Sequence, residues 1–99
     1  MIPMATQFED RTFRYTQVAR QGDVAIYRQT HKASDIDRFE VVRIRIAEEH
    51  TWPDGRTTPE REVYPHANSW GALGWTFYKR EDAEVKMQSL QTDKESTSE

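Results

Sequence analysis

Two tryptophans and two glycines gather in the segment SWGALGWT, which spans residues 69–76. Exposed indole rings there would form an aromatic platform on which a base, a peptide or a partner's side chain could stack. Alternatively, Trp70 and Trp75 plug the seam between a sheet and a helix. Gly71 and Gly74 would then let the chain turn tightly between them. Both interpretations hold if one indole is buried, and we expect that to be Trp75 because it leads into a strand.

Arginines supply the second set of candidate binding residues. Guanidinium groups bind phosphates and carboxylates in a bidentate geometry, so arginines on the outward face of a sheet could meet nucleic acid or an acidic protein. The alternative is a solvated face on which arginines pair with glutamates of neighbouring strands, here Glu40, Glu60 and Glu62. The arginines that could share such a face are Arg28, Arg43, Arg45, Arg56 and Arg61.

The segment EVYPH, residues 62–66, gives a smaller signal. Proline cannot donate a hydrogen bond to a sheet, so a strand should close there. We expect Tyr64 and Pro65 to anchor this strand end beneath the Trp–Gly loop. Their expected role is therefore packing rather than recognition of a ligand. The binding candidates are therefore Trp70, Arg28, Arg43, Arg45 and Arg61, and the structural candidates are Tyr64, Pro65, Gly71, Gly74 and Trp75.

Residue types needed for catalysis or metal binding are sparse. The chain has no cysteine, which excludes disulfides, thiolate zinc sites and thiol nucleophiles. Its three histidines come from separate loops without the spacing of metal ligands. No phosphate-binding loop or Gly-x-Ser-x-Gly motif is present, and Asp35 and Asp37 suit a turn for backbone reasons alone. The sequence therefore predicts a protein that is not an enzyme and uses no metal or cofactor.

Charge is spread unevenly along the 99 residues, whose net charge is −3. Residues 81–99 carry six acids and two bases, whereas residues 1–80 carry twelve bases and eleven acids. A nearly neutral body gives little electrostatic support for nucleic-acid binding. The N-terminal segment lacks the pattern of a signal peptide, and no apolar run is long enough to span a bilayer. We expect a cytoplasmic protein that does not enter a membrane.

Period-two alternation and turn residues locate most of the predicted strands. Residues 13–30 suggest a hairpin that turns at RQGD, where Gly22 can adopt positive φ. Residues 38–50 contain the clearest strand. Its core face should carry Val42, Ile44 and Ile46, leaving Arg43 and Arg45 more exposed. A turn at residues 51–57 and a returning strand at 59–66 follow, with a short strand near 75–78.

The end of the chain predicts one helix over about residues 80–91. Ala83, Met87 and Leu90 share a helical face, and acidic residues fill the first turn, where the helix dipole favours them. The predicted fold class is α+β, an antiparallel meander of four to five strands with this helix packed on one face. We expect a flexible N-terminus at 1–11, a single domain at 12–91 and a disordered acidic tail at 92–99.

Residues 22–90 resemble a type of small, largely uncharacterised protein of phages, prophages and plasmids. The resemblance rests on GDVAIYRQT, FEVVRIRI, EVYPHANSWGALGWTFY and EDAEVKMQSL, in that order. It implies an accessory protein of a mobile element and brings no catalytic residues. Small proteins of such elements often bind a host protein, including components of defence systems such as CRISPR complexes.

A shorter stretch is similar to the WGR domain of DNA-damage-responsive poly(ADP-ribose) polymerases. Trp70, Gly71, Gly74 and Ala83 match its pattern of Trp-Gly-Arg, a nearby glycine, a strand and a helix that begins around an alanine. Ala72 stands where the arginine of that motif should be. The similarity therefore implies a shared local geometry only. The DNA contacts of that family are not carried over, because the arginine of the motif is absent.

Three functions remain open from the sequence. The leading one is a non-enzymatic protein-binding module that binds or inhibits a host factor, because free sheet edges and exposed aromatic side chains are common interface material. The alternative is a WGR-like nucleic-acid-binding module that uses the sheet arginines and Trp70 for backbone contact and stacking. The third is a homodimer whose subunits pair their sheet edges.

Overall fold

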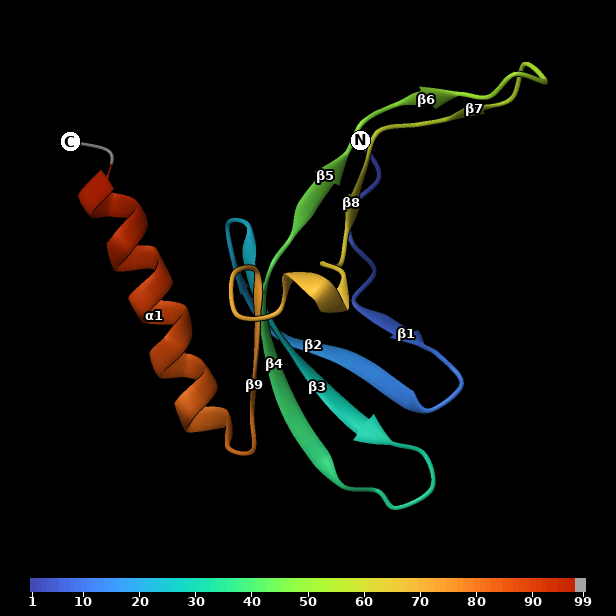
Figure 1. Ribbon diagram of the computed structural model, residues 1–99. Helices are drawn as coiled ribbons and strands as arrows, with labels where there is room; N and C mark the ends of the chain where they lie inside the picture. Colours follow the sequence, from blue (N-terminus) through green and yellow to red (C-terminus); the bar gives the residue numbers. More distant parts are fainter. Residues whose placement is uncertain (98–99) are drawn as a thin grey trace.

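The computed structural model describes residues 1–97, with side chains up to Gln91, and has the predicted α+β architecture. Five strands form one antiparallel sheet in the order β1-β2-β3-β4-β9. Helix α1, Arg80–Thr97, packs on β3, β4 and β9 from one side (Figure 1). The strands of this sheet are β1 Gln7–Glu9, β2 Phe13–Gln21, β3 Val24–His31, β4 Asp37–Arg43 and β9 Gly74–Phe77.

The hairpin predicted over residues 13–30 is confirmed. β2 and β3 pair along their whole length, and Gly22 adopts φ 61° at the turn between them. The register shifts between Gln17 and Ala19, which is a β-bulge. Because the bulge adds a residue to β2, both Val18 and Ala19 pack toward the helix side of the sheet.

Beyond β4 the chain leaves the main sheet and forms a two-part arm, which extends away from the body in Figure 1. The base of the arm pairs β5, Arg45–Ala47, with β8, Arg61–Val63. Its outer part pairs β6, His50–Thr51, with β7, Thr57–Thr58. The turn and the returning strand predicted here are confirmed, with Gly55 at φ 92°.

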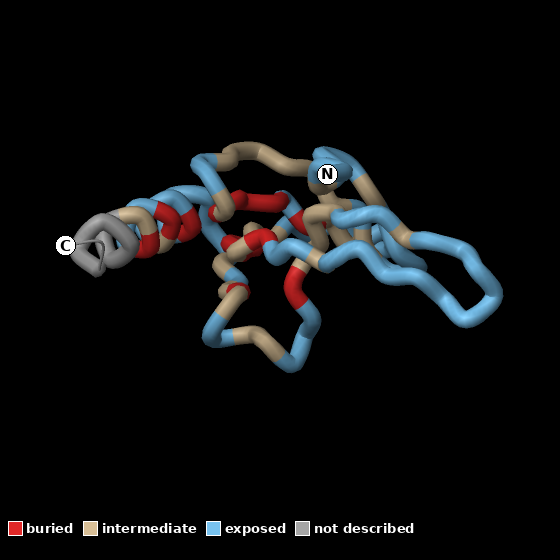
Figure 2. Tube along the Cα trace, turned by 90° about the horizontal axis from the view of Figure 1, so that it is seen from above, coloured by how far each residue is buried: buried red, intermediate tan, exposed pale blue. Residues whose placement is uncertain are grey.

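The core lies on both faces of the sheet, because β3 and β4 carry buried apolar side chains on each face. On the helix face Val24, Ile26 and Val41 pack against Ala83, Met87 and Leu90 of α1. On the opposite face a second cluster contains Ala25, Tyr27, Val42 and Ile44. Figure 2 shows buried residues on the helix and in the middle of the molecule, with exposed segments at the periphery.

One prediction about the core strand is wrong in part. Val42 and Ile44 are buried, but Ile46 is 57% exposed because it lies on β5, after the chain has turned into the arm. Val41 alternates onto the same face as Arg43, which was expected to be more exposed, yet Val41 is fully buried beneath the helix. The helix therefore covers the face of β4 opposite to the predicted one.

The predicted helix is confirmed, and its stripe of Ala83, Met87 and Leu90 is buried as expected. The helix extends past the predicted end at residue 91 to Thr97, and no glycine or proline follows Gly74 to stop it. The predicted tail at residues 92–99 overlaps this last part of the helix, and residues 98–99 lie outside the described residues. The disorder of that tail stays a prediction.

The N-terminal segment, predicted to be flexible, pairs with the rest of the fold. β1 adds a strand beside β2, and Phe8 stacks on the ring of Tyr15 with centroids 4.6 Å apart. Ile2 exchanges backbone hydrogen bonds with β8, from Ile2 N–H to Glu60 O and from Glu62 N–H to Ile2 O. Sequence reasoning missed this strand because its three residues, Gln7–Glu9, are too few to show a period.

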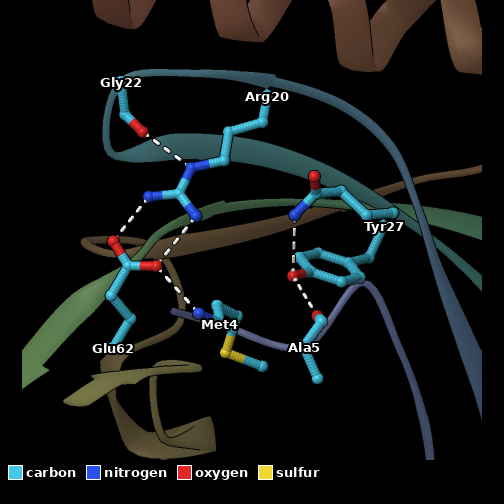
Figure 3. A network of polar contacts seen from close by, with 7 residues as sticks. Met4, Ala5, Arg20, Gly22, Tyr27 and Glu62 are labelled. Atoms are coloured by element: carbon cyan, nitrogen blue, oxygen red, sulfur yellow. Dashed lines mark hydrogen bonds and ion pairs between the residues drawn. The ribbon is translucent and has the colours of Figure 1, made fainter. Parts of the chain in front are cut away.

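A polar network fastens this segment beneath the sheet (Figure 3). The Arg20 guanidinium donates two hydrogen bonds to the Glu62 carboxylate, at 2.9 and 2.7 Å, and the Met4 N–H donates a third at 2.8 Å. The hydroxyl of Tyr27 donates to the Ala5 carbonyl at 2.8 Å. The hydrogen bonds from Arg20, followed by the Met4 N–H, lower the pKa of Glu62 to about 2.

The double-sided core predicts that Ile26→Ala lowers the free energy of unfolding by about 2–5 kcal/mol, since it opens a cavity at a fully buried position. The matched control is Val85→Ala on the outer side of α1, where the side chain is 70% exposed. That substitution should change the free energy of unfolding by no more than about 0.5 kcal/mol. Urea unfolding followed by circular dichroism measures both, and equal effects would contradict the packing.

The Arg20–Glu62 pair predicts a loss of stability in acid. Because the folded pKa of Glu62, about 2, lies below its usual value of 4.5, the pair stabilises the fold above pH 4.5. This contribution should be lost as the pH falls from 4.5 through 2. Glu62→Gln should lack that part of the pH dependence. A carboxyl titration by NMR with a Glu62 midpoint near 4.5 in the wild-type protein would refute the pair.

A candidate binding pocket walled by aromatic side chains

A pocket of about 360 Å³ opens on the face of the sheet that the helix leaves uncovered. Apolar and aromatic side chains form its walls, and two buried polar side chains lie at its floor. The mixture is typical of binding pockets, in which apolar walls surround a few placed polar groups. The lining residues are Tyr15, Gln29, Glu40, Tyr64, Pro65, Ala67 and Trp70.

Strand register sets the floor of the pocket. Tyr15 on β2 pairs directly with Gln29 on β3, and Glu40 on β4 pairs directly with Thr76 on β9. Gln29 and Glu40 are diagonal neighbours, since Tyr27 is the β3 partner of Glu40. Side chains alternate between the faces of a strand, so these residues all point away from the helix.

The crossing from β8 to β9 supplies the outer wall. Tyr64 and the buried Pro65 follow β8, and a 3-10 helix η1, Ala67–Ser69, leads to Trp70. The Trp70 ring lies in a stacked arrangement with Tyr64, with centroids 6.3 Å apart and planes at 27°. The indole N–H of Trp70 donates to the Thr76 hydroxyl at 2.9 Å. This hydrogen bond fixes the ring against the sheet.

Two glycines allow the Trp70 ring to lie close to the backbone at the start of β9. Gly71 adopts φ 93°, which non-glycine residues rarely adopt, and its N–H donates to the Gly74 carbonyl at 2.7 Å. Gly74 lies directly under the Trp70 ring, so that a Cβ atom at this position would overlap the indole. This wall of the pocket therefore requires a glycine four residues after Trp70, because a larger residue at position 74 would clash with the indole.

Glu40 is the central polar group of the floor and is 7% exposed. It accepts a hydrogen bond from the Tyr64 hydroxyl at 2.6 Å, another from the Thr76 hydroxyl at 3.3 Å and a third from the Gln29 amide at 3.4 Å. Burial raises the pKa of Glu40, although the two hydroxyl donors and the charge of Arg38 act in the opposite direction.

The tyrosine that faces Glu40 stays protonated. Burial, followed by the nearby Glu40 charge, raises the pKa of Tyr64, so its hydroxyl remains a donor to that carboxylate. The rings of Tyr64 and Tyr27 meet edge to face with centroids 5.3 Å apart, and Phe8 packs on Tyr64 at 5.5 Å. This cluster holds the wall rigid, because aromatic edges and faces attract each other.

Gln29 is 5% exposed and only half satisfied. Its amide donates to the Tyr15 hydroxyl at 3.0 Å and to Glu40, whereas its carbonyl oxygen Oε1 is buried without any hydrogen-bond partner among the described residues. Leaving a buried acceptor unpaired costs about 1–3 kcal/mol. The pocket floor therefore contains one acceptor without a donor, and a ligand that donates a hydrogen bond to it would remove this cost.

The two tryptophans lie on opposite faces of the sheet. Trp70 belongs to the pocket, whereas Trp75 packs on the helix side, where the Lys86 ammonium lies 4.3 Å from its ring centroid. Both are half-buried, so the expectation that Trp75 is the buried indole of the two is not confirmed. Only Trp75 lies at the seam between sheet and helix.

The structure does not bring the candidate arginines together. Arg43 forms an ion pair with Asp23 at 3.7 Å on the helix side. Arg28 is exposed on that same face, beside Asp35 and Asp37. Arg45 and Arg61 lie on the arm, on β5 and β8. None of these four lines the pocket, so the site contains Trp70 alone of the five predicted binding residues.

The predicted glutamate partners also differ. Glu62 pairs with Arg20 instead of a candidate arginine, and Glu40 accepts from hydroxyl and amide groups. Sequence reasoning missed Tyr15 and Gln29 as pocket residues. A signal existed in β3, where Ala25, Tyr27 and Gln29 recur with period two and place a polar amide in line with core residues.

Metal and membrane sites find no support within residues 1–97. No group of three or more histidine, aspartate or glutamate side chains there could hold a metal ion. No helix in the same part of the chain combines the length and apolar character needed to cross a bilayer. The chain matches no protein-family model, no curated protein and no solved structure. The two resemblances drawn from the sequence thus stay predictions.

The buried carboxyl predicts a pH effect opposite to that of Glu62. Because burial raises the pKa of Glu40 above its usual 4.5, its contribution to stability is present below pH 4.5 and is lost as the pH rises through the folded pKa. The stability of the wild-type protein relative to Glu40→Gln should therefore fall from pH 4 to pH 7. Urea unfolding across that range measures it, and a relative stability that rises with pH would contradict the burial.

Proposed function

We propose that this protein is a non-enzymatic protein-binding module whose binding surface is the pocket face of the sheet. The observation that carries the proposal is the pocket itself, with aromatic walls around a buried carboxylate and a buried carbonyl oxygen that has no donor among the described residues. Aromatic anchors around desolvated polar groups are the usual centre of a protein interface. The catalytic constellations sought in the sequence have no counterpart in this site.

The shape of the molecule supports the same proposal. It measures 46 Å in two directions and 21 Å in the third, so it presents broad faces. Its accessible surface is 6857 Å², against roughly 5,900 Å² for a compact protein of this mass. Part of the excess belongs to the arm, where Ile46 and Trp52 are about half-exposed. Such apolar side chains are suited to contact a partner beside the pocket.

The finer part of the proposal concerns the partner. The resemblance to accessory proteins of phages and plasmids favours a host protein, including a component of a defence system, as the bound factor. Binding would occupy or block a surface of that host factor without chemical change. A small protein with one binding face is sufficient for this role.

A pull-down from bacterial lysate tests the proposal when three forms of the protein are compared. The wild-type protein should capture a stoichiometric protein partner. Glu40→Gln should weaken that capture at least about tenfold, because it removes the charged acceptor of the pocket. Glu81→Gln is the matched control, since it makes the same chemical change at an exposed position on α1 and should leave capture unchanged.

Other results would contradict the proposal. Capture that Glu40→Gln and Glu81→Gln reduce equally would show that the pocket is not the binding surface. Recovery of nucleic acid in place of protein, with an affinity that falls steeply with salt, would favour the WGR-like alternative. Recovery of the protein alone as a stable dimer would favour pairing of its own sheet edges.

A further inference from the structure

We propose that the pocket binds the guanidinium group of an arginine side chain of the partner, with Glu40 and Gln29 as its two acceptors. This inference rests on the proposed function and adds the chemical identity of the bound group. It follows from the donors and acceptors at the floor, the walls around them and the positions of this protein's own cations.

The donors at the floor already have acceptors, because the Tyr64 hydroxyl, the Thr76 hydroxyl and the Gln29 amide donate to Glu40. The Glu40 carboxylate accepts three hydrogen bonds from the protein, whereas a carboxylate presents about four acceptor positions. The Gln29 Oε1 atom accepts none. A bound group therefore has to donate at least two hydrogen bonds, and it should be cationic, because it meets a carboxylate that is nearly removed from water.

Two neighbouring acceptors favour arginine over lysine. The Gln29 amide nitrogen lies 3.4 Å from Glu40 Oε2, so the two side chains lie next to each other on the floor. A guanidinium presents its N–H groups in a rigid planar fork, which can donate to both side chains at once. A lysine ammonium is a point charge with no such fixed geometry.

The walls suit the same group. Tyr15, Tyr64 and Trp70 line the pocket. The faces of tyrosine and tryptophan rings attract cations, arginine more often than lysine. Pro65 and Ala67 complete an apolar surface for the methylene groups of the side chain. A pocket of about 360 Å³ has room for one such side chain.

The cations of this protein near the pocket are engaged elsewhere. Arg38, on the same face of β4 as Glu40, places its guanidinium 5.3 Å from the ring centroid of Phe13. Among the described residues it forms no ion pair with Glu40. Arg20 is held by Glu62. In the part of the chain that the structure describes, the carboxylate on the pocket floor therefore has no ion pair with a cation of this protein, which leaves that role to a bound group.

Three short peptides test the identity of the bound group with the full-length protein. The probes are acetyl-Gly-Arg-Gly-amide, its lysine analogue and its citrulline analogue, which keeps the shape of arginine without the charge. NMR titration at neutral pH should shift the Trp70 indole N–H and the Gln29 side-chain amide on adding the arginine peptide. We expect a dissociation constant of about 1 mM and at least about tenfold weaker binding of citrulline.

Variants locate the contact. Glu40→Gln and Gln29→Met should each weaken binding of the arginine peptide at least about tenfold, and Glu81→Gln should leave that binding unchanged. The second pocket variant removes the unpaired acceptor without placing a new polar group in the core, which keeps the test valid if the first variant unfolds. Binding of lysine or citrulline as tight as that of arginine would overturn the inference, and so would shifts confined to other faces.

The outcomes separate this inference from the proposed function. If a partner is captured through the pocket but no arginine peptide binds, the protein-binding role stands and the guanidinium assignment is wrong. If the arginine peptide binds but no protein partner is captured, the pocket chemistry stands and the protein-binding role is wrong.

Discussion

The structure depends on the burial of β3 and β4 on both faces. Val24, Ile26 and Val41 point one way and Tyr27 and Val42 the other, and all five are removed from water. A sheet that is apolar on both sides needs two covers. The described residues form one α-helix, which covers one face, and a loop and the N-terminal segment form the second cover.

That second cover creates the site. A helix would seal its face with a continuous stripe, whereas the crossing from β8 to β9 and the segment around Phe8 cover theirs with rings that meet at edges and faces. The rings leave a pocket, and the β-register places Gln29 and Glu40 at its floor. Hydroxyls of Tyr64 and Thr76 keep the carboxylate hydrogen-bonded, while the Gln29 carbonyl oxygen stays unpaired.

The sequence predicted the elements better than the site. Turn residues and alternation located the strands of the hairpin and the arm, and a helical apolar stripe located the helix, because these signals are local. Alternation could not decide which face of β4 the helix covers, since Val41 and Val42 are equally apolar. β1 was too short to show a pattern. The pocket joins residues from three strands and a loop, so Tyr15 and Gln29 could be recognised only once register was known. Trp70 was recognisable because two glycines follow it closely in the sequence, which indicates that its ring packs against the backbone.

The central claim is that the two faces of the sheet have different covers, with one of these two tryptophans on each face. A nuclear Overhauser spectrum of the wild-type protein tests it most directly. The account predicts contacts from the Trp70 ring to Tyr64, contacts from the Trp75 ring to Lys86 on the helix, and none between the two indoles. Contacts from both indoles to helix α1, with Tyr64 remote from Trp70, would contradict it.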